Sequence, residues 1–505
     1  MAVKRMLHND ADNIALLENV HPSDWQNPQP SGKYNLVVVG AGPAGIITAR
    51  EAATRGAKVA LIERDLFGGG CLNTGCIPSK TIIRTSRLYA DIRNAENFGG
   101  RVPGDFNVDF PFVMKRVREI RARISERAFS ARQLASLGVD VYFGEASFAG
   151  PSSVALNGQT IHFKKALIAT GSRPIVPSIP GLEEAGYLTN ENVFDLTQLP
   201  PRLLVIGGGP LGCELAQAFS RLGSQVTIVQ DEPMFLLQEE RDAAQILSDA
   251  LSRDGIDIHL NTQTVGVRVE GDQKLVELRS DDSTTTVAVD EILIGVGQNP
   301  NVEALNLEAA GVKYDVKSGI KVNDFLQTTN KRIYAAGDVC FEHMFTHIED
   351  ASASIVIQNA LFLGRKRLSD LAIPWCTYTD PEIAHVGMYV REARRRGIPV
   401  ETFTILMSDI HRAIADGEED GFVKISVKAG TDKILGATVV ARHAGEMIND
   451  ISLAITRGIG LSALSSVTHP YPTQAQAIKM AADAHKRASV PWFRKWLSRQ
   501  WLARW

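Results

Sequence analysis

The sequence is poor in cysteine and has no long apolar run. Its 505 residues contain 5 cysteines, too few for a secreted disulfide scaffold. No stretch of about 18 consecutive apolar residues occurs, so no membrane-spanning helix is predicted. Residues 1–12 mix charges and lack the apolar core of a signal peptide. A net charge of -3 argues against nucleic acid as the main partner. The sequence therefore predicts a cytoplasmic globular protein with roughly two to four domains.

Two of the cysteines, Cys71 and Cys76, are separated by four residues in a glycine-rich segment, and a helix is predicted from Pro78 to Asn94. Proline is favoured at the first helical position, where its missing N–H has no partner to lose. Cys76 therefore lies near a helix N-terminus, where the dipole stabilises a thiolate. Such a thiolate with a second thiol within reach is the arrangement of a reversible redox disulfide. A structural disulfide and a zinc pair are the alternatives. Zinc would need a second pair, whereas the other cysteines are isolated: Cys213, Cys340 and Cys376.

A dinucleotide-binding motif lies directly before the cysteines. Residues 36–39 form a continuous apolar run, as in a parallel strand covered on both faces. A glycine-rich turn, a predicted helix over 46–55 and a second strand over 59–62 follow, and Glu63 comes next. The turn contains Gly40, Gly42, Pro43, Ala44 and Gly45. The glycines permit close approach of a pyrophosphate, the helix N-terminus holds the phosphates, and the acid binds a ribose hydroxyl.

A second copy of this motif follows later in the chain. An apolar strand over 203–206 leads into a glycine-rich turn, a helix that extends to Leu222 and a strand over 226–229. The glycines of this copy are Gly207, Gly209 and Gly212. Two dinucleotide sites in one chain predict two nucleotides that exchange electrons. The cysteine pair directly follows the first motif, so the first site is expected to hold the cofactor that reacts with it. The second site then holds a mobile hydride donor.

The residue at the end of the second strand of each motif bears on which nucleotide is bound, and in the second motif it bears on whether the hydride donor is NADH or NADPH. Glu63 lies 23 residues after Gly40, and 23 residues after Gly207 lies Gln230. A glutamate at this position repels the 2′-phosphate of NADPH, and an arginine nearby attracts it. Gln230 is neutral, and the two residues after it are acidic. NADH is therefore favoured over NADPH.

Two further strands end in segments that suit a nucleotide cofactor. One is followed by Thr170-Gly171 and the other by Gly337-Asp338. An aspartate at a strand end can accept hydrogen bonds from ribityl or ribose hydroxyls, although alone it is more often a turn residue. From about Leu371, apolar residues alternate with period two and no nucleotide motif occurs, which predicts a separate α+β domain.

Together these motifs resemble the flavin-dependent pyridine nucleotide–disulfide oxidoreductases over roughly residues 34–485. The segment that ends at Lys80 matches the active-site signature of that family, Gly-Gly-x-Cys-x-Asn-x-Gly-Cys-x-Pro-Ser-Lys, and residues 378–384 and 444–449 match its interface domain. The resemblance implies an α/β fold class, with two Rossmann-like nucleotide-binding domains for FAD and NAD(P) and a C-terminal α+β dimerisation domain. It also implies a homodimer in which each subunit completes the site of the other.

The resemblance also implies domain bounds and cofactor contacts. The expected domains are an N-terminal arm (1–33), an FAD-binding domain (34–171 and 299–369), an NAD(P)-binding domain (172–298), a dimerisation domain (370–485) and a basic tail (486–505). The FAD contacts are Gly40, Gly42, Pro43, Ala44, Gly45, Glu63, Gly70, Lys80, Thr170, Gly171, Gly337, Asp338, Thr346 and His347. The NAD(P) contacts are Gly207, Gly209, Gly212, Glu214, Gln230 and Gly297.

The family mechanism implies a role for each reactive residue. The hydride of the donor goes to the flavin, and the reduced flavin opens the Cys71–Cys76 disulfide. Cys76 is the flavin-proximal thiol and becomes the thiolate, and Cys71 is the outer thiol that meets the substrate. Lys80 lies under the flavin with Glu214 as its partner, since a buried lysine charge requires one. A metal-ion substrate would have Cys71 and Cys76 as transient ligands.

The C-terminal segment departs from the family's disulfide reductases, which use a histidine and a glutamate five residues later as an acid/base dyad. With residues 472–473 aligned, Tyr471 and Gln476 take these positions. With His469 aligned, Gln474 takes the place of the glutamate. Neither register has a carboxylate. His469 is then either a weaker base or a residue at the start of a helix.

Tyr471 and the Ile-Lys-x-Ala-Ala sequence after it resemble mercuric reductases, as do residues 409–413 and 421–424. Metal-ion reduction needs thiolate ligands and no base for a leaving thiol. Two features of that group are missing, an N-terminal metal-binding domain and a C-terminal cysteine pair. The expected function is an FAD-dependent NAD(P)H:disulfide oxidoreductase that passes electrons through Cys71 and Cys76 to a thiol-binding acceptor such as Hg(II) or another soft metal ion. A dihydrolipoamide dehydrogenase-like reaction on a small disulfide is the alternative.

The tail, residues 486–505, has six basic residues and no acidic one. Four of the six tryptophans lie in it: Trp492, Trp496, Trp501 and Trp505. A basic amphipathic segment of this kind suits peripheral contact with a membrane surface or a partner helix, and packing on its own subunit is the other interpretation. A membrane-associated flavoprotein redox sensor is therefore the hypothesis from a different functional class.

Overall fold

The computed structural model of the protein describes residues 10–102, 107–281, 283–340, 346–490 and 492–503. The chain divides into two compact units. The first contains Met1–Phe235 and Asp254–Asp370, and the second contains Leu236–Arg253 and Leu371–Trp505. Within the described residues, no helix is long and apolar enough to cross a membrane.

The large sheet of the first unit is built around β1 (Lys33–Val39), whose side chains are almost all buried. The strand order is β3-β2-β1-β6-β5-β4, with β18 beside β6. The other strands are β2 (Val59–Glu63), β3 (Val139–Phe143), β4 (Ala146–Gly150), β5 (Ser153–Leu156), β6 (Gln159–Ile168) and β18 (Ile333–Ala335). β1 pairs in parallel with β2 and β6, and Val39 is in register with Ile62 and Ile168. The carboxyl ends of these strands therefore meet at one edge, where ligands bind in open parallel sheets.

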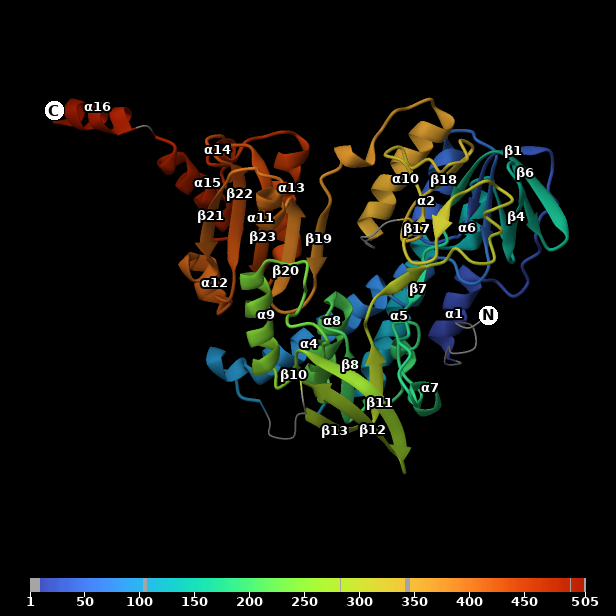
Figure 1. Ribbon diagram of the computed structural model, residues 1–505, viewed down its shortest axis with the longest axis horizontal. Helices are drawn as coiled ribbons and strands as arrows, with labels where there is room; N and C mark the ends of the chain where they lie inside the picture. Colours follow the sequence, from blue (N-terminus) through green and yellow to red (C-terminus); the bar gives the residue numbers. More distant parts are fainter. Residues whose placement is uncertain (1–9, 103–106, 282, 341–345, 491, 504–505) are drawn as a thin grey trace. The chain divides into compact units, whose positions relative to one another are not determined.

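Helices α2 (Pro43–Thr54) and α10 (Thr346–Leu361) pack against each other beside this sheet (Figure 1). The remaining helices of this part are α1 (Ala11–Val20), α3 (Gly69–Asn73), α4 (Cys76–Arg93), η2 (Ala95–Phe98), α5 (Phe110–Ala128) and α6 (Ala131–Ser136). The arm predicted from the sequence contains α1, which packs on α5 and buries Asn13, Leu16 and Val20. The arm is thus part of the packed unit.

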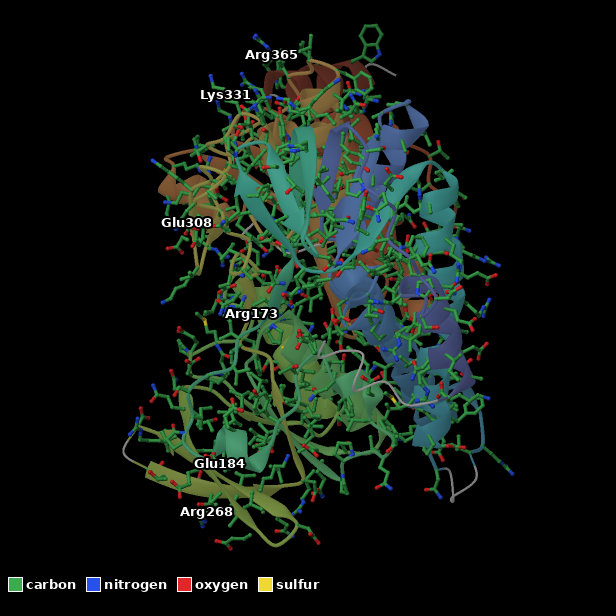
Figure 2. All side chains as sticks on the ribbon, turned by 90° about the vertical axis from the view of Figure 1, so that its right-hand side faces the viewer. Arg173, Glu184, Arg268, Glu308, Lys331 and Arg365 are labelled. Atoms are coloured by element: carbon green, nitrogen blue, oxygen red, sulfur yellow. The ribbon has the colours of Figure 1, made fainter. Side chains whose placement is uncertain are left out.

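A second parallel sheet repeats the β–α–β pattern, with the order β10-β9-β8-β14. Its elements are β8 (Arg202–Ile206), α8 (Pro210–Leu222), β9 (Gln225–Val229), β10 (Asp257–His259) and β14 (Glu291–Ile294). An antiparallel meander of β11 (Thr262–Glu270), β12 (Gln273–Ser280) and β13 (Ser283–Val289) accompanies it. The strand pair β7 (Ser172–Pro174) and β15 (Gln298–Pro300) joins the two parts of the first unit. Figure 2 shows Arg173 of β7 between the large sheet and the meander.

The second unit contains a five-stranded antiparallel sheet in the order β19-β20-β23-β22-β21. The strands are β19 (Pro374–Thr377), β20 (Glu382–Gly387), β21 (Val400–Leu406), β22 (Phe422–Lys428) and β23 (Ile434–Ala441). The helices are α9 (Arg241–Arg253), α11 (Val390–Arg395), α12 (His411–Asp416), α13 (Ala444–Thr456), α14 (Leu461–Leu464), α15 (Gln476–Ala488) and α16 (Trp492–Leu502). Helix α9 belongs here because Glu239, just before it, accepts hydrogen bonds from Trp375 Nε1 (2.9 Å) and Tyr389 Oη (2.7 Å).

Short elements complete the chain. In the first unit they are α7 (Leu182–Ala185), η3 (Val193–Asp195), β16 (Tyr314–Asp315), β17 (Gly319–Ile320) and η4 (Leu368–Asp370), and in the second η5 (Met407–Asp409). The predicted fold class is confirmed: two parallel α/β sheets with a glycine-rich loop each, and a separate α+β unit.

Candidate active site

The first glycine-rich loop, between β1 and α2, is packed tightly on the sheet. Gly40 has a φ of 104°, and a Cβ there would lie 2.2 Å from the carbonyl oxygen of Ala169. A Cβ on Gly45 would lie 1.9 Å from the carbonyl oxygen of Gly40. Gly42, the N-cap of α2, has no described heavy atom within 4 Å of an added Cβ. The loop therefore leaves room in front of the first turn of α2, whose N–H groups suit an anionic phosphate.

Glu63, the last residue of β2, fixes this loop. Its carboxylate accepts hydrogen bonds from the backbone N–H groups of Ala41 (2.7 Å) and Asp65 (2.8 Å). Burial raises the pKa of Glu63, and the two N–H donors oppose that shift. Each carboxylate oxygen has a second lone pair, so acceptor capacity remains for a ribose hydroxyl.

Cys71 and Cys76 lie on two consecutive helices. Cys71 is in α3, and Cys76 is the first residue of α4. The sequence predicted a helix start at Pro78. The helix begins two residues earlier because proline is tolerated throughout the first turn, where the N–H groups have no intrahelical partner. Both cysteines are half-buried and line one cavity. The N-terminal dipole of α4 therefore acts on Cys76 directly.

A buried arginine that the sequence did not single out supports the cysteine-bearing helix. Arg121 of α5 is 1% exposed, and its Nη1 donates to the carbonyl oxygen of Asn73 (2.9 Å) at the end of α3. Its Nη2 donates to Asn13 of α1 (3.3 Å) and lies 3.4 Å from a carboxylate oxygen of Asp195. The N-terminal helix thus contributes to holding the cysteine segment.

The cavity has a volume of about 310 Å³ and extends from the first glycine-rich loop to the cysteines. Twelve residues proposed from the sequence line it: Gly40, Gly42, Pro43, Ala44, Glu63, Gly70, Cys71, Cys76, Thr170, Gly171, Gly337 and Asp338. Gly45 and Lys80 are not among the lining residues. Thr346 and His347 begin α10, and their side chains lie outside the described part of the chain. Ser172, Asn190, Glu191 and Glu349 line the cavity without having been predicted.

Asp338 presents a carboxylate on the wall of this cavity. Ser172 Oγ donates to Asp338 Oδ2 at 2.9 Å, and burial raises the pKa of Asp338. The cavity thus combines a helix N-terminus for phosphates, glycines that leave room for them, and carboxylates for hydroxyl groups. This set fits an elongated dinucleotide cofactor such as FAD.

The second glycine-rich loop repeats the geometry of the first. A Cβ on Gly207 would lie 2.5 Å from the carbonyl oxygen of Gly295, and one on Gly212 would lie 2.0 Å from that of Gly207. Gln230 Oε1 accepts a hydrogen bond from the backbone N–H of Gly208 at 2.7 Å. Gln230 therefore makes the contact that Glu63 makes to Ala41 in the first loop, as counting along the sequence indicated. The other two predicted contacts are Gly209, the N-cap of α8, and Gly297, with a φ of 122°.

A salt bridge connects the cysteine helix with the second nucleotide motif. Lys80 Nζ of α4 lies 2.9 Å from Glu214 Oε2 of α8. The Glu214 side chain is almost fully buried and that of Lys80 is about one-third exposed. The lysine therefore compensates charge on the buried carboxylate.

Comparison with known proteins supports the same chemistry. The profile of the family "Pyridine nucleotide-disulphide oxidoreductase" matches residues 34–356, and that of its dimerisation domain matches residues 373–482. The chain belongs to the pyridine nucleotide-disulphide oxidoreductase family.

Two curated relatives of this oxidoreductase differ in their substrates. A mercuric reductase from Staphylococcus aureus is 34% identical over 451 residues, which cover 89% of this chain and 82% of the relative. A dihydrolipoyl dehydrogenase from Thermus scotoductus is also 34% identical over 467 residues, which cover 90% of this chain and 98% of the relative. This chain is thus an NAD(P)H-dependent flavoprotein disulfide oxidoreductase, and these relatives do not distinguish its acceptor.

Two solved structures have the same fold. The HOCl-induced flavoprotein disulfide reductase RclA from Escherichia coli, as a Cu(II) complex, matches with a TM-score of 0.79 and 30% identity, and covers 88% of this chain and 98% of its own. LpdA from Mycobacterium tuberculosis matches with a TM-score of 0.80 and 28% identity. The match covers 89% of this chain and 99% of LpdA. FAD and a pyridine nucleotide are the cofactors expected for this family, and the dimerisation domain supports a homodimer.

The predicted residues near the C-terminus of this oxidoreductase lie in the second unit. Tyr471 is 70% exposed, and its hydroxyl lies 3.0 Å from His411 Nδ1. His469 Nε2 lies 3.5 Å from a carboxylate oxygen of Asp450, and both of its ring nitrogens lack a hydrogen bond within the described residues. The two predicted side chains therefore have separate partners. His411 was not predicted, and no signal in the sequence marks it beyond its place in the segment 409–413.

The glutamines proposed in place of the family glutamate also lie in this unit. Gln474 Nε2 donates to Glu418 Oε2 at 2.6 Å, and Gln476 is the first residue of α15. The carboxylate that contacts Gln474 therefore comes from Glu418, on a distant segment of the chain, and the one near His469 comes from Asp450.

Proposed function

We propose that this oxidoreductase passes electrons from NADH through FAD and the Cys71–Cys76 disulfide to an acceptor that binds thiolates, with Hg(II) or another soft metal ion as substrate. The observation that carries this proposal is the environment of Tyr471, whose hydroxyl pairs with His411 and, within the described residues, with no carboxylate that would complete a histidine–glutamate dyad. A metal ion held by two thiolates needs no base for a leaving thiol. Mercuric reductases among the relatives agree with this acceptor class.

The residues of the cavity are proposed to hold FAD, which supplies the relay of an electron pair between the hydride donor and the disulfide. The first glycine-rich loop and Glu63 bind its adenosine diphosphate half, and Asp338 accepts from a hydroxyl of the remainder. Cys76 is the thiol beside the flavin, and Cys71 is the outer thiol. Lys80 positions the flavin and is held by Glu214.

The second loop is proposed to bind the hydride donor, with NADH favoured. Gln230 is neutral, and Asp231 and Glu232 beside it are exposed acids. They disfavour a 2′-phosphate by repulsion. The domain bounds implied by the resemblance, a cytoplasmic location and the homodimeric site complete the proposal.

A second candidate is a dihydrolipoamide dehydrogenase-like reaction, which the relatives of that name support. A third is a membrane-associated redox sensor, favoured by α16 at the C-terminus. There Phe493, Trp496, Leu497, Trp501 and Leu502 are all exposed, and the described part of the helix has no acidic residue. A peripheral contact between this helix and an anionic membrane would fit such a sensor.

Stopped-flow spectroscopy distinguishes these candidates. The enzyme is reduced with NADH and mixed with Hg(II) or with lipoamide, and the long-wavelength absorbance of the reduced enzyme is followed. Rapid decay with Hg(II) alone is the expected result, and decay with lipoamide alone would reject the metal-ion acceptor. Slow reoxidation by every acceptor would favour the sensor.

Substitution of the outer cysteine, Cys71, tests whether electrons pass through the disulfide to the acceptor. Cys71→Ala is expected to abolish acceptor reduction and to leave flavin reduction by NADH intact. The matched control is Cys376→Ala, a half-buried cysteine of the second unit that does not line the cavity. Acceptor turnover in Cys71→Ala would exclude the disulfide from the path.

A further inference from the structure

Glu349 is an acidic residue on the wall of the cavity that neither the motifs nor the proposed mechanism uses. It lies in the first turn of α10, and it lines the cavity together with Ala44, Cys76, Gly337 and Asp338. Glu63 lines the same cavity at the glycine-rich loop. Glu349 therefore lies where the first turn of α2, the Gly337-Asp338 strand end and Cys76 come together.

The side chain of Glu349 lies beside Gly337, the residue before Asp338. A Cβ added to Gly337 would lie 3.4 Å from Glu349 Oε1 and 3.7 Å from its Cγ. Gly337 has a φ of 79°, so a glycine is favoured there for its backbone as well. The side chain of Glu349 is thus packed along the strand end that carries Asp338.

One oxygen of the Glu349 carboxyl lacks a hydrogen-bond partner within the described residues. This atom, Oε2, is buried. A buried polar atom of this kind calls for a partner from outside the chain, such as a bound ligand. The side chain as a whole is half-buried, so part of it remains accessible from the cavity.

Its surroundings favour the uncharged form of the carboxyl. Burial raises the pKa of Glu349 well above the ordinary value, and the nearby Asp338 and Cys76 add to the shift. A hydrogen bond from the backbone N–H of Ala44 opposes it. A protonated carboxyl, unlike a carboxylate, can donate a hydrogen bond.

We propose that Glu349 is a further cofactor-binding residue, whose buried carboxyl contacts the redox-active end of the bound cofactor and favours its reduced, negatively charged state. This inference rests on the proposed FAD site. A hydrogen bond to a charged acceptor commonly changes an equilibrium about tenfold. Removal of the carboxyl is therefore expected to weaken binding of reduced FAD about tenfold relative to oxidised FAD, which for a two-electron couple lowers the midpoint potential by about 30 mV.

The test compares Glu349→Ala and Glu349→Gln in the full-length holoenzyme, with Cys71 and Cys76 both replaced by serine so that the flavin alone is titrated. Spectroelectrochemistry gives the midpoint potential, and reconstitution of apoenzyme with FAD gives the affinity. Glu349→Gln retains a neutral donor, so its potential is expected to remain close to that of the parent. Asp350→Asn is the matched control, since Asp350 is the next residue of α10 and is exposed.

A lower potential in Glu349→Ala, with Glu349→Gln and Asp350→Asn unchanged, supports the proposal. A potential equal to that of the parent in Glu349→Ala overturns it. Equal shifts in both Glu349 variants overturn the neutral-donor role. Thermal unfolding identifies a variant that fails to fold, and Glu349→Met, which removes the carboxyl and keeps the length of the side chain, then replaces Glu349→Ala in the comparison. Absence of FAD from the parent enzyme would instead reject the proposed cofactor site itself.

Discussion

The two glycine-rich loops make the same hydrogen bond with chemically different side chains. In the first loop, the Glu63 carboxylate accepts from the N–H of Ala41 at 2.7 Å. In the second loop, the Gln230 amide oxygen accepts from the N–H of Gly208 at the same distance. The contact that shapes the loop thus requires an acceptor oxygen and no charge.

The loops differ in the charge of this side chain and in its other hydrogen-bonding groups. Glu63 accepts a second backbone hydrogen bond, from Asp65, and its burial opposes ionisation. Gln230 has an amide group with two donors and no charge to desolvate. We therefore expect charge at this position to act in nucleotide recognition, whereas the hydrogen bond that shapes the loop is common to both sites. The two roles can be separated by substitution.

The largest expected effect is on the first loop. Glu63→Ala removes the acceptor of two backbone N–H groups, each costing about 1–3 kcal/mol when left unsatisfied. FAD affinity is expected to fall about 100-fold, since each 1.4 kcal/mol is a factor of ten. The dissociation constant is measured by reconstitution of apoenzyme.

The matched variant is Gln230→Ala, which removes one acceptor from the second loop. It is expected to raise the KM for the nucleotide donor about tenfold and to leave FAD content unchanged. Loss of FAD from Gln230→Ala and not from Glu63→Ala would reverse the assignment of the two sites.

A smaller effect is expected from single methyl groups in front of the helices. Gly42 and Gly209 have φ values of -70° and -80°, which any residue adopts, and an added Cβ meets nothing closer than 3.8 Å. Alanine at either position should fold normally and obstruct the phosphates. Gly42→Ala is expected to weaken FAD binding about tenfold, and Gly209→Ala to raise the donor KM by a similar factor.

The controls for this pair are Gly45→Ala and Gly212→Ala. An added Cβ at these positions would lie 1.9 Å and 2.0 Å from a carbonyl oxygen, so these variants are expected to lose thermal stability whether or not nucleotide is present. Unchanged FAD affinity in Gly42→Ala would show that the cofactor does not lie against α2.

A pH-dependent effect is expected from the charge of Glu63. Burial raises its folded-state pKa above the ordinary value of 4.5, so the folded apoprotein binds its proton more tightly than the unfolded chain. The resulting stabilisation is present below about pH 4.5 and is lost as the pH rises through the folded pKa. Glu63→Gln lacks this contribution. The melting temperature of the wild-type apoprotein is therefore expected to fall relative to Glu63→Gln as the pH rises.

The size of this effect is about 1.4 kcal/mol for each tenfold difference in proton affinity between the folded and unfolded states. Gln230→Ala provides the control, because no ionisable group is lost and its melting temperature should follow that of the wild type at a constant offset. A wild-type curve parallel to that of Glu63→Gln would mean that Glu63 ionises normally in the folded state.

Both loops could be predicted from the sequence because their signals are local. Apolar strands, glycines at fixed spacing and a polar residue at the second strand end all lie within about 30 residues of one another. Counting from Gly40 and Gly207 located Gln230, and the hydrogen bond to Gly208 agrees with that count. Helix α4 was also predicted from local information, although its start at Cys76 lies two residues before the predicted one at Pro78.

The support of the cysteine segment could not be predicted, because its contacts join distant parts of the chain. Arg121 and Asn73 are 48 residues apart, and Arg121 and Asn13 are 108 apart. Arginine and glutamate are usually exposed, so nothing in the sequence marks Arg121 or Glu349 as facing inward. His411 and Tyr471 are likewise 60 residues apart.

The smallest expected effect is on the choice of the donor. In Gln230→Glu, a carboxylate oxygen can still accept from the N–H of Gly208, as Glu63 does from Ala41, so the loop and NADH binding should be retained. The added charge acts mainly on a 2′-phosphate. A repulsion of about 1 kcal/mol, the size expected for two fully solvated charges about 4 Å apart, lowers kcat/KM for NADPH about fivefold. The ratio of kcat/KM for NADH over NADPH is measured at low and at high ionic strength, and its increase in Gln230→Glu is expected to be smaller at high ionic strength because exposed charges are screened. A ratio that does not change in Gln230→Glu would mean that the 2′ position of the bound donor does not face residue 230. The two loops would then share the backbone hydrogen bond but not the contact with the ribose.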